Sequence, residues 1–307
     1  MSQHQRLLLI APTTMTRTPA FDRAGALAHA LQLPLHIVAF DYVQALAVAG
    51  FFAPEQISQA IDGYLKTHRR WLTEQAESLS KLGVEVTSEV VWVQHPYEEI
   101  VQFVNEMPVA MIIKDAQEEP ALKRVFFVPL DWQLLRDCPV PVHLVTHPLN
   151  ARPRNVLAII DVLRGEDQDH VFNDQIIDAA VKLAEVCNAR LELLHVFDWT
   201  SLYTQDMGFG ALPLATGIYE ALGSVQHEAF AAIAERHGVP PECRHFMEGV
   251  PVPSICGFAV EHHTDVIVMG TVQNKGLEKL LGATAEQLLH RAPCDVLAIK
   301  PDRMLQS

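Results

Sequence analysis

The sequence has few cysteines and a shortage of positive charge. Its 5 cysteines form no CxxC pair, and an odd number cannot all pair within one chain, so neither a disulfide framework nor a cysteine zinc site is expected. Only 23 Lys and Arg stand against 37 Asp and Glu, which gives a net charge of -14. Nucleic acid and anionic membranes repel such a chain and are not expected partners.

Long apolar runs and histidine motifs are also missing. No segment approaches the roughly 18 uncharged apolar residues of a membrane helix. The polar start Met1–Arg6 does not resemble a signal peptide, so we expect a soluble, cytoplasmic protein. The 15 histidines include no HExxH pair. His245 lies in an expected strand, and the neighbours His262 and His263 cannot share one helix face, so no metal site is predicted.

The chain does contain an internal repeat. Gln133-Leu134-Leu135 returns as Gln287-Leu288-Leu289, roughly 150 residues later, which is too long for a solenoid unit and typical of a duplicated domain. The length of 307 residues also suits two domains. We predict domain 1 at 1–149 and domain 2 at 153–303, with a short linker between them.

Each copy alternates buried-strand patterns with amphipathic helix patterns. The expected strands are Arg6–Pro12, Leu33–Asp41, Val84–Val93, Val109–Lys114 and Val140–Val145, then Val156–Asp161, Arg190–Asp198, Arg244–Glu248, Val266–Gly270 and Asp295–Lys300. The expected helices are Pro19–Gln32, Glu55–Leu82, Tyr97–Asn105 and Leu130–Arg136, then Asn173–Cys187, Tyr219–His237, Val252–His262 and Thr284–Arg291. This alternation predicts an α/β protein of two doubly wound, five-stranded parallel sheets with right-handed crossovers.

Doubly wound sheets bind ligands beyond the carboxyl ends of their strands. In the second copy Asp161 ends the first strand, and Gly270, Gly276 and Gly282 follow the fourth strand, with Thr284 opening the next helix. Glycines let backbone N–H groups approach a phosphate, and a helix N-terminus favours an anion. This pattern makes the second copy a candidate nucleotide site, although an ordinary loop also explains the glycines and Asp is a common turn residue.

The first copy lacks these features. Ala11-Pro12 stands where Asp161 stands, Lys114–Pro120 replaces the glycine loop, and Val128-Pro129 replaces Gly282-Ala283. Three acidic residues without a glycine would repel a phosphate and prevent its close approach. We therefore expect no nucleotide in domain 1.

Three segments of the second copy carry a family resemblance. Val266-Ile-Val-Met-Gly-Thr271, Gly282-Ala-Thr-Ala-Glu-Gln287 and Asp295-Val-Leu-Ala-Ile-Lys-Pro301 resemble the universal stress protein family. The resemblance covers nearly the whole chain and is to the tandem, UspE-like form with two domains. It implies the adenine nucleotide alpha hydrolase-like version of the α/β fold, with the two domains related by a pseudo-two-fold axis.

Family members that bind ATP use an Asp after strand one, a backbone Val after strand two and a loop of the form G-x2-G-x9-G-[ST]. The resemblance assigns these roles to Asp161, Val196, Gly270 and Gly282. This chain departs from the loop pattern in three ways. It has Gln273 at the middle glycine, one residue fewer before Gly282, and Ala283 for the hydroxyl residue, with Thr284 next to it. As a hypothesis, Gly276 partly substitutes for the lost glycine.

The resemblance implies a non-catalytic stress-response protein that holds a small-molecule ligand, with ATP or a related nucleotide in domain 2 only. A weak ATP hydrolase is the enzymatic alternative, but no carboxylate or His is placed by motif to activate a water. The third alternative is a scaffold, or a carrier of an apolar metabolite beneath the long apolar connection Trp199–Leu222. Single-domain relatives dimerise through the last strand, which implies pairing of Val140–Val145 with Asp295–Lys300 within this chain; a homodimer stays open.

Overall fold

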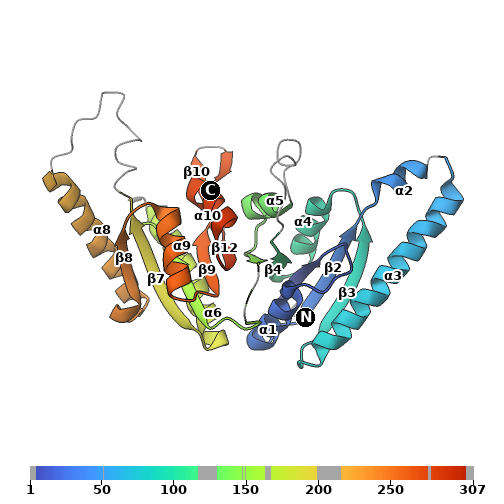
Figure 1. Cartoon of the computed structure of the whole chain (residues 1–307), viewed down its shortest axis with the longest axis horizontal. Helices are drawn as coiled ribbons and strands as arrows, with labels where there is room; N and C mark the ends of the chain where they lie inside the picture. Colours follow the sequence, from blue (N-terminus) through green and yellow to red (C-terminus); the bar gives the residue numbers. More distant parts are fainter. Residues whose placement is uncertain are drawn as a thin grey trace. The chain divides into compact units, whose positions relative to one another are not determined.

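The computed structural model describes residues 5–50, 52–116, 130–146, 148, 150–162, 167–198, 216–275 and 278–301. The chain divides into two compact units, Met1–Arg152 and Pro153–Ser307 (Figure 1). Gly276 and most of the connection Trp199–Leu222 lie outside the described residues.

The first unit contains five parallel strands in the order β3-β2-β1-β4-β5. The strands are β1 Arg6–Ala11, β2 Leu35–Asp41, β3 Val86–Trp92, β4 Val109–Asp115 and β5 Val142–Val145. The helices are α1 Pro19–Leu31, α2 Gln44–Ala49, α3 Pro54–Ser80, α4 Pro96–Glu106 and α5 Leu130–Asp137.

The second unit repeats this order as β8-β7-β6-β9-β12, again with parallel neighbours. Its sheet is built from β6 Asn155–Ile159, β7 Arg190–Phe197, β8 Arg244–Glu248, β9 Val266–Gly270 and β12 Asp295–Ile299. Its helices are α6 Asp167–Cys187, α8 Thr216–Arg236, α9 Pro251–Glu261 and α10 Ala283–Arg291, with a short 3-10 turn, η2, at Pro241–Cys243.

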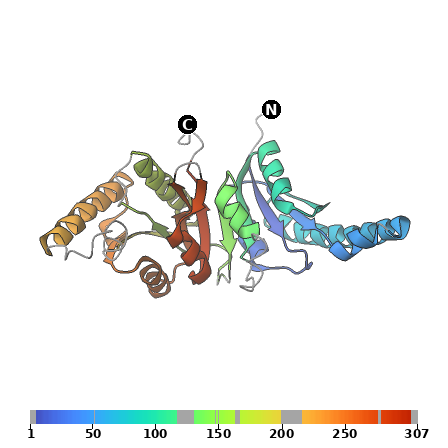
Figure 2. The same ribbon diagram turned by 90° about the horizontal axis from the view of Figure 1, so that it is seen from above.

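Helices cover both faces of the sheet in each unit (Figure 2). In the second unit α6 packs on β6 and β9, whereas α9 packs on β7 and on α10. A parallel sheet covered on both sides needs central strands that are apolar throughout. Leu7, Leu8 and Leu9 of β1 accordingly have no exposed surface.

The predicted fold class and the alternation of strands and helices are confirmed, with most element ends within one or two residues. Helix α2 was not among the predicted elements, and α6 begins at Asp167 rather than at Asn173 because its first residues carry no apolar periodicity. The largest difference is an antiparallel hairpin, β10 Val272–Lys275 and β11 Glu278–Leu281, where a glycine loop was predicted. None of the described helices combines the length and apolar character that crossing a membrane requires.

Candidate functional site

The predicted ligand residues of the second unit follow neighbouring strands. The sheet order places β6 between β9 and β7, so Asp161, Gly270 and Val196 all belong to the same carboxyl edge. Strand β6 ends at Ile159, where it pairs with Leu194, while β7 continues to Phe197. This stagger creates the kind of edge position at which doubly wound sheets bind ligands.

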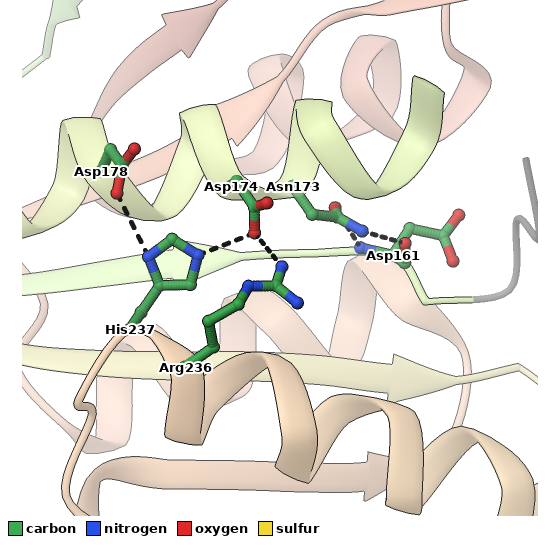
Figure 3. A network of polar contacts seen from close by, with 6 residues as sticks. All are labelled: Asp161, Asn173, Asp174, Asp178, Arg236 and His237. Atoms are coloured by element: carbon green, nitrogen blue, oxygen red, sulfur yellow. Dashed lines mark hydrogen bonds and ion pairs between the residues drawn. The ribbon is translucent and has the colours of Figure 1, made fainter. Parts of the chain in front are cut away.

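Asn173 fixes the backbone of Asp161. The N–H of Asp161 donates to Oδ1 of Asn173 at 3.3 Å, and Nδ2 of Asn173 donates to the carbonyl of Asp161 at 2.7 Å. Asn173 is buried at 4% exposure, whereas Asp161 is exposed. Figure 3 shows the carboxylate of Asp161 turned away from Asn173. The amide therefore orients the main chain and leaves the carboxylate directed outward.

Val196 offers its backbone rather than its side chain. Along a strand, the N–H and C=O groups of one residue point to one side, and those of the next residue point to the other side. The carbonyl of Leu194 accepts from the N–H of Ile160 at 3.1 Å, on the β6 side, and the carbonyl of Phe197 accepts from Gly249 on the β8 side. Val196 therefore directs its backbone groups toward β6, just beyond the point at which β6 has ended.

Helix α10 begins at this same edge, after β9 and the hairpin. Gly282 is its N-cap residue, with no side-chain cap, and Thr284 in its first turn is exposed. The first N–H groups of a helix lack intrahelical acceptors and attract anions. The N–H of Gly282 itself donates to the carbonyl of Thr271 at 3.1 Å. Because the N–H of Glu286 makes the first intrahelical bond, to Gly282, the donors left for an anion are those of Ala283, Thr284 and Ala285.

Gly270 has a packing role that the sequence did not reveal. A Cβ at this position would lie 2.5 Å from Cε1 and 2.7 Å from Cζ of Phe172, and 3.1 Å from Cδ1 of Ile176. Both neighbours belong to α6, so the missing side chain lets that helix approach β9. This packing contact explains the glycine at position 270 without any role in phosphate binding.

The hairpin changes the surroundings of the predicted phosphate loop. Gln273, at the middle-glycine position of the family pattern, pairs with Leu280 across β10 and β11. A β-branched Val272 and the pair Leu280-Leu281 favour extended structure over a glycine-rich turn. Residues Val272–Lys275 and Glu278–Leu281 are therefore strands in place of an irregular loop.

A polar network continues from Asn173 along α6 to the end of α8. Asp174 accepts a hydrogen bond from Arg236 and one from Nε2 of His237 at 2.7 Å, and Nδ1 of His237 contacts Asp178 at 3.1 Å (Figure 3). Burial acts to raise the pKa of Asp174, but the hydrogen bonds from His237 and Arg236 outweigh it and hold the pKa below its ordinary value.

We expect Asp174→Asn to weaken the acid dependence of stability. Since the folded pKa lies below the unfolded value of about 3.9, the ionised Asp174 stabilises the fold above roughly pH 4, and this contribution is lost as the pH falls through the folded pKa. Urea unfolding between about pH 3 and pH 6 measures the slope. Asp178→Asn is the matched control, because that carboxylate is 72% exposed. Equal slopes in wild type and Asp174→Asn would contradict the assignment.

In the first unit a carboxylate lies at the start of α1, the helix that corresponds to α6 of the second unit. Asp115, at the end of β4, accepts a hydrogen bond from the hydroxyl of Thr18 and another from the N–H of Ala20 at 3.2 Å, both at the N-terminus of α1. Burial raises the pKa of Asp115, while these two hydrogen bonds act to lower it. An internal carboxylate thus lies at the carboxyl edge of the first unit's sheet.

A buried acid–imidazole pair lies beyond β2 of the first unit. Oδ2 of Asp41 contacts Nδ1 of His68 at 2.5 Å, and neither side chain has exposed surface. Within the described part of the chain, Oδ1 of Asp41 and Nε2 of His68 have no hydrogen-bond partner. The rings of Tyr64 and Trp71 lie 6.3 and 5.6 Å from the imidazole. Burial, and then the charge of Asp41, raise the pKa of Tyr64.

Together the two units define a tandem doubly wound α/β protein, with a ligand-type edge retained in the second unit. The profile described as "Universal stress protein family" matches residues 7–146 and 162–300. The chain belongs to the universal stress protein family, in the tandem form that its repeat predicted.

Its relatives share this organisation. Universal stress protein E of Escherichia coli K12 is 26% identical over 308 residues, covering 99% of this chain and 96% of the relative. The Haemophilus influenzae homologue is 26% identical over 93% of the chain and 96% of its own length. A functionally unknown Pseudomonas aeruginosa PAO1 protein superposes with a TM-score of 0.70 at 24% identity, covering 99% of this chain and 95% of its own. A universal stress protein from Archaeoglobus fulgidus superposes with a TM-score of 0.64 at 17% identity, covering 96% of this chain and 98% of its own. At these identities both structures support the fold alone.

Proposed function

We propose that this chain is a non-catalytic stress-response protein that binds ATP or a related nucleotide in its second unit only. The observation that carries the proposal is the meeting of three features at one edge of that sheet. The exposed carboxylate of Asp161, the backbone of Val196 and the start of α10 at Gly282 all follow the carboxyl ends of neighbouring strands.

Each feature suits one part of a nucleotide. The carboxylate of Asp161 accepts hydrogen bonds from ribose hydroxyls, and the backbone of Val196 offers a donor and an acceptor to a base. The first N–H groups of α10, with the positive end of the helix dipole, suit a phosphate. Thr284 adds an exposed hydroxyl, whereas a role of Gly270 and Gly276 at the ligand stays a prediction of the resemblance.

The first unit supports the restriction to one site. At the carboxyl edge of its sheet, the start of α1 holds Asp115, which accepts from Thr18 and Ala20. A phosphate there would meet a carboxylate and would have to displace these hydrogen bonds. Like charges in one partly buried position repel strongly.

A titration of Mg²⁺–ATP against wild type and Gly282→Trp tests the proposal. We expect wild type to bind one nucleotide per chain and Gly282→Trp to lose binding at least about 100-fold, because a buried glycine at the helix start becomes an indole in the phosphate position. Gly63→Trp in α3 is the matched control, since nothing lies within 4 Å of a Cβ built there.

The other outcomes separate the alternatives. A weak ATP hydrolase would be supported instead if phosphate is released in proportion to the protein present and this release is lost in Gly282→Trp. Absence of nucleotide binding in every variant would contradict the proposal and favour a scaffold or an apolar-ligand carrier. Pairing of the last strands, Val142–Val145 and Asp295–Ile299, and a cytoplasmic location stay predictions of the resemblance.

A further inference from the structure

Three side chains that ligate metals meet at the other end of the second unit's strands. Glu192 lies near the start of β7, His245 near the start of β8, and His262 directly after α9. Their ligand atoms all lie within 4.8 Å of one another. The residues are far apart in sequence and form no motif, which explains why the sequence alone predicted no metal site.

The glutamate is the buried centre of this group. Its side chain is 6% exposed, with Oε2 at 3.0 Å from Nδ1 of His262 and Oε1 at 3.7 Å from Nε2 of His245. The second distance is too long for a hydrogen bond. Nε2 of His245 is buried, and among the described residues it has no hydrogen-bond partner. A buried ring nitrogen directed at a carboxylate is a ready ligand.

Phe258 holds both imidazoles in place. The ring of His262 stacks on it at 3.7 Å with an interplanar angle of 13°, and the ring of His245 lies 4.7 Å from it. Phe258 is itself buried in the core between α9 and the sheet. The two histidines therefore need little reorganisation to bind an ion, which favours tight binding.

We propose that Glu192, His245 and His262 form a binding site for a divalent transition-metal ion, Zn²⁺ in the first place, with the fourth position taken by water. Two imidazoles and a carboxylate are a ligand set that Zn²⁺ accepts. Bonds of about 2.0–2.1 Å in a tetrahedron set ligand atoms about 3.4 Å apart. Measured from the single oxygen Oε1 of Glu192, the distances of 3.1 Å to Nδ1 of His262 and 3.7 Å to Nε2 of His245 lie on either side of this value.

The charges around the site fit this assignment, although Arg190 would compete with a metal ion for Glu192. Burial lowers the pKa of His245, which Glu192 opposes and which the charges of His262 and Arg190 support. Arg190 contacts Oε1 of Glu192 at 3.1 Å, but its side chain is 58% exposed and can turn into solvent. A bound metal ion would replace the guanidinium as the partner of Glu192.

The same unit offers a matched control group. His237 also lies between carboxylates, but its Nε2 faces Asp174 and its Nδ1 faces Asp178. The two nitrogens of one ring point in opposite directions, so these three residues cannot all ligate one ion. Zinc bound through this group would be weak.

Zn²⁺ titration of the metal-stripped full-length protein, in competition with a chromophoric chelator, tests the site. We expect one tight site per chain in wild type and in His237→Gln. Affinity should fall about 100-fold or more in His245→Gln and in His262→Gln, since loss of a ligand costs at least as much as loss of a supporting residue. Arg190→Gln should bind several-fold more tightly, an effect that a purely structural ion pair would not produce.

Two checks keep the result interpretable. Circular dichroism shows whether each variant is folded, and Arg190→Gln tests the site without touching the core. Because the chain has five free cysteines, the absorption spectrum of the Co²⁺ form distinguishes imidazole and carboxylate ligands from thiolates. Equal affinity in wild type, His245→Gln and His262→Gln, a thiolate spectrum, or no stoichiometric binding would each overturn the proposal.

Discussion

Replacing His68 with leucine should lower the free energy of unfolding by about 3–5 kcal/mol, because removal of one partner leaves an uncompensated buried charge. Asp41 and His68 are both without exposed surface and contact each other at 2.5 Å. The leucine would leave the Asp41 carboxylate among apolar neighbours with no partner of opposite charge. Urea unfolding followed by tryptophan fluorescence measures the loss, since Trp71 lies 5.6 Å from the imidazole.

A double variant separates the contribution of the Asp41–His68 contact to stability from the contribution of side-chain packing. Asp41→Asn combined with His68→Leu removes the charge together with its partner, and we expect it to recover more than half of the lost stability. If the single and double variants unfold at the same urea concentration, the cost comes from the shape of the imidazole and the charge interpretation fails.

Gly270→Ala should cost about 1–3 kcal/mol in the absence of any ligand, because overpacking a tight contact forces neighbouring atoms to shift. The new Cβ would lie 2.5 Å from Cε1 of Phe172, on the face where α6 meets β9. Thermal unfolding of the ligand-free protein measures the effect. In Gly257→Ala, where nothing lies within 4 Å of the new Cβ, we expect a gain of up to about 1 kcal/mol from helix propensity.

A second substitution, at Phe172, should restore part of the stability that Gly270→Ala removes. Gly270→Ala combined with Phe172→Leu replaces the flat ring edge with a shorter side chain, and the two changes together should cost less than the sum of their separate effects. Strictly additive costs would mean that the glycine is not required by this contact. A loss of stability seen only when nucleotide is present would instead assign Gly270 to the ligand.

Periodic patterns allowed most of the fold to be predicted. Strand β9 begins and ends where its apolar pattern predicted, because a strand buried beneath helices must be apolar along its whole length. The pattern failed where tertiary contacts decide the conformation. The hairpin β10–β11 lies in a segment whose glycines suggested a loop, and the first turn of α6 has no apolar stripe.

Only the site residues that belong to local sequence motifs could be predicted. Asp161 and Gly282 follow strand ends and open helices, so sequence order placed them at one edge. Asn173, which orients Asp161, and Asp115, which accepts from Thr18, act through contacts that only the folded chain creates. No periodicity encodes such partners, because the spacing between them depends on loops and crossovers.

The carboxylate of Asp115 also makes the two units differ in what determines their resistance to heat. At the start of α1 the carboxylate is a covalent part of the chain, so Thr18 and Ala20 have their acceptor without any bound ion. Helix α10 has no side-chain cap, and any anion that settles there raises the melting temperature of its own unit by an amount that grows with the logarithm of the anion concentration. Under the proposed function, the melting temperature of the second unit would therefore change with the supply of its ligand, while the Asp115 contact of the first unit would not.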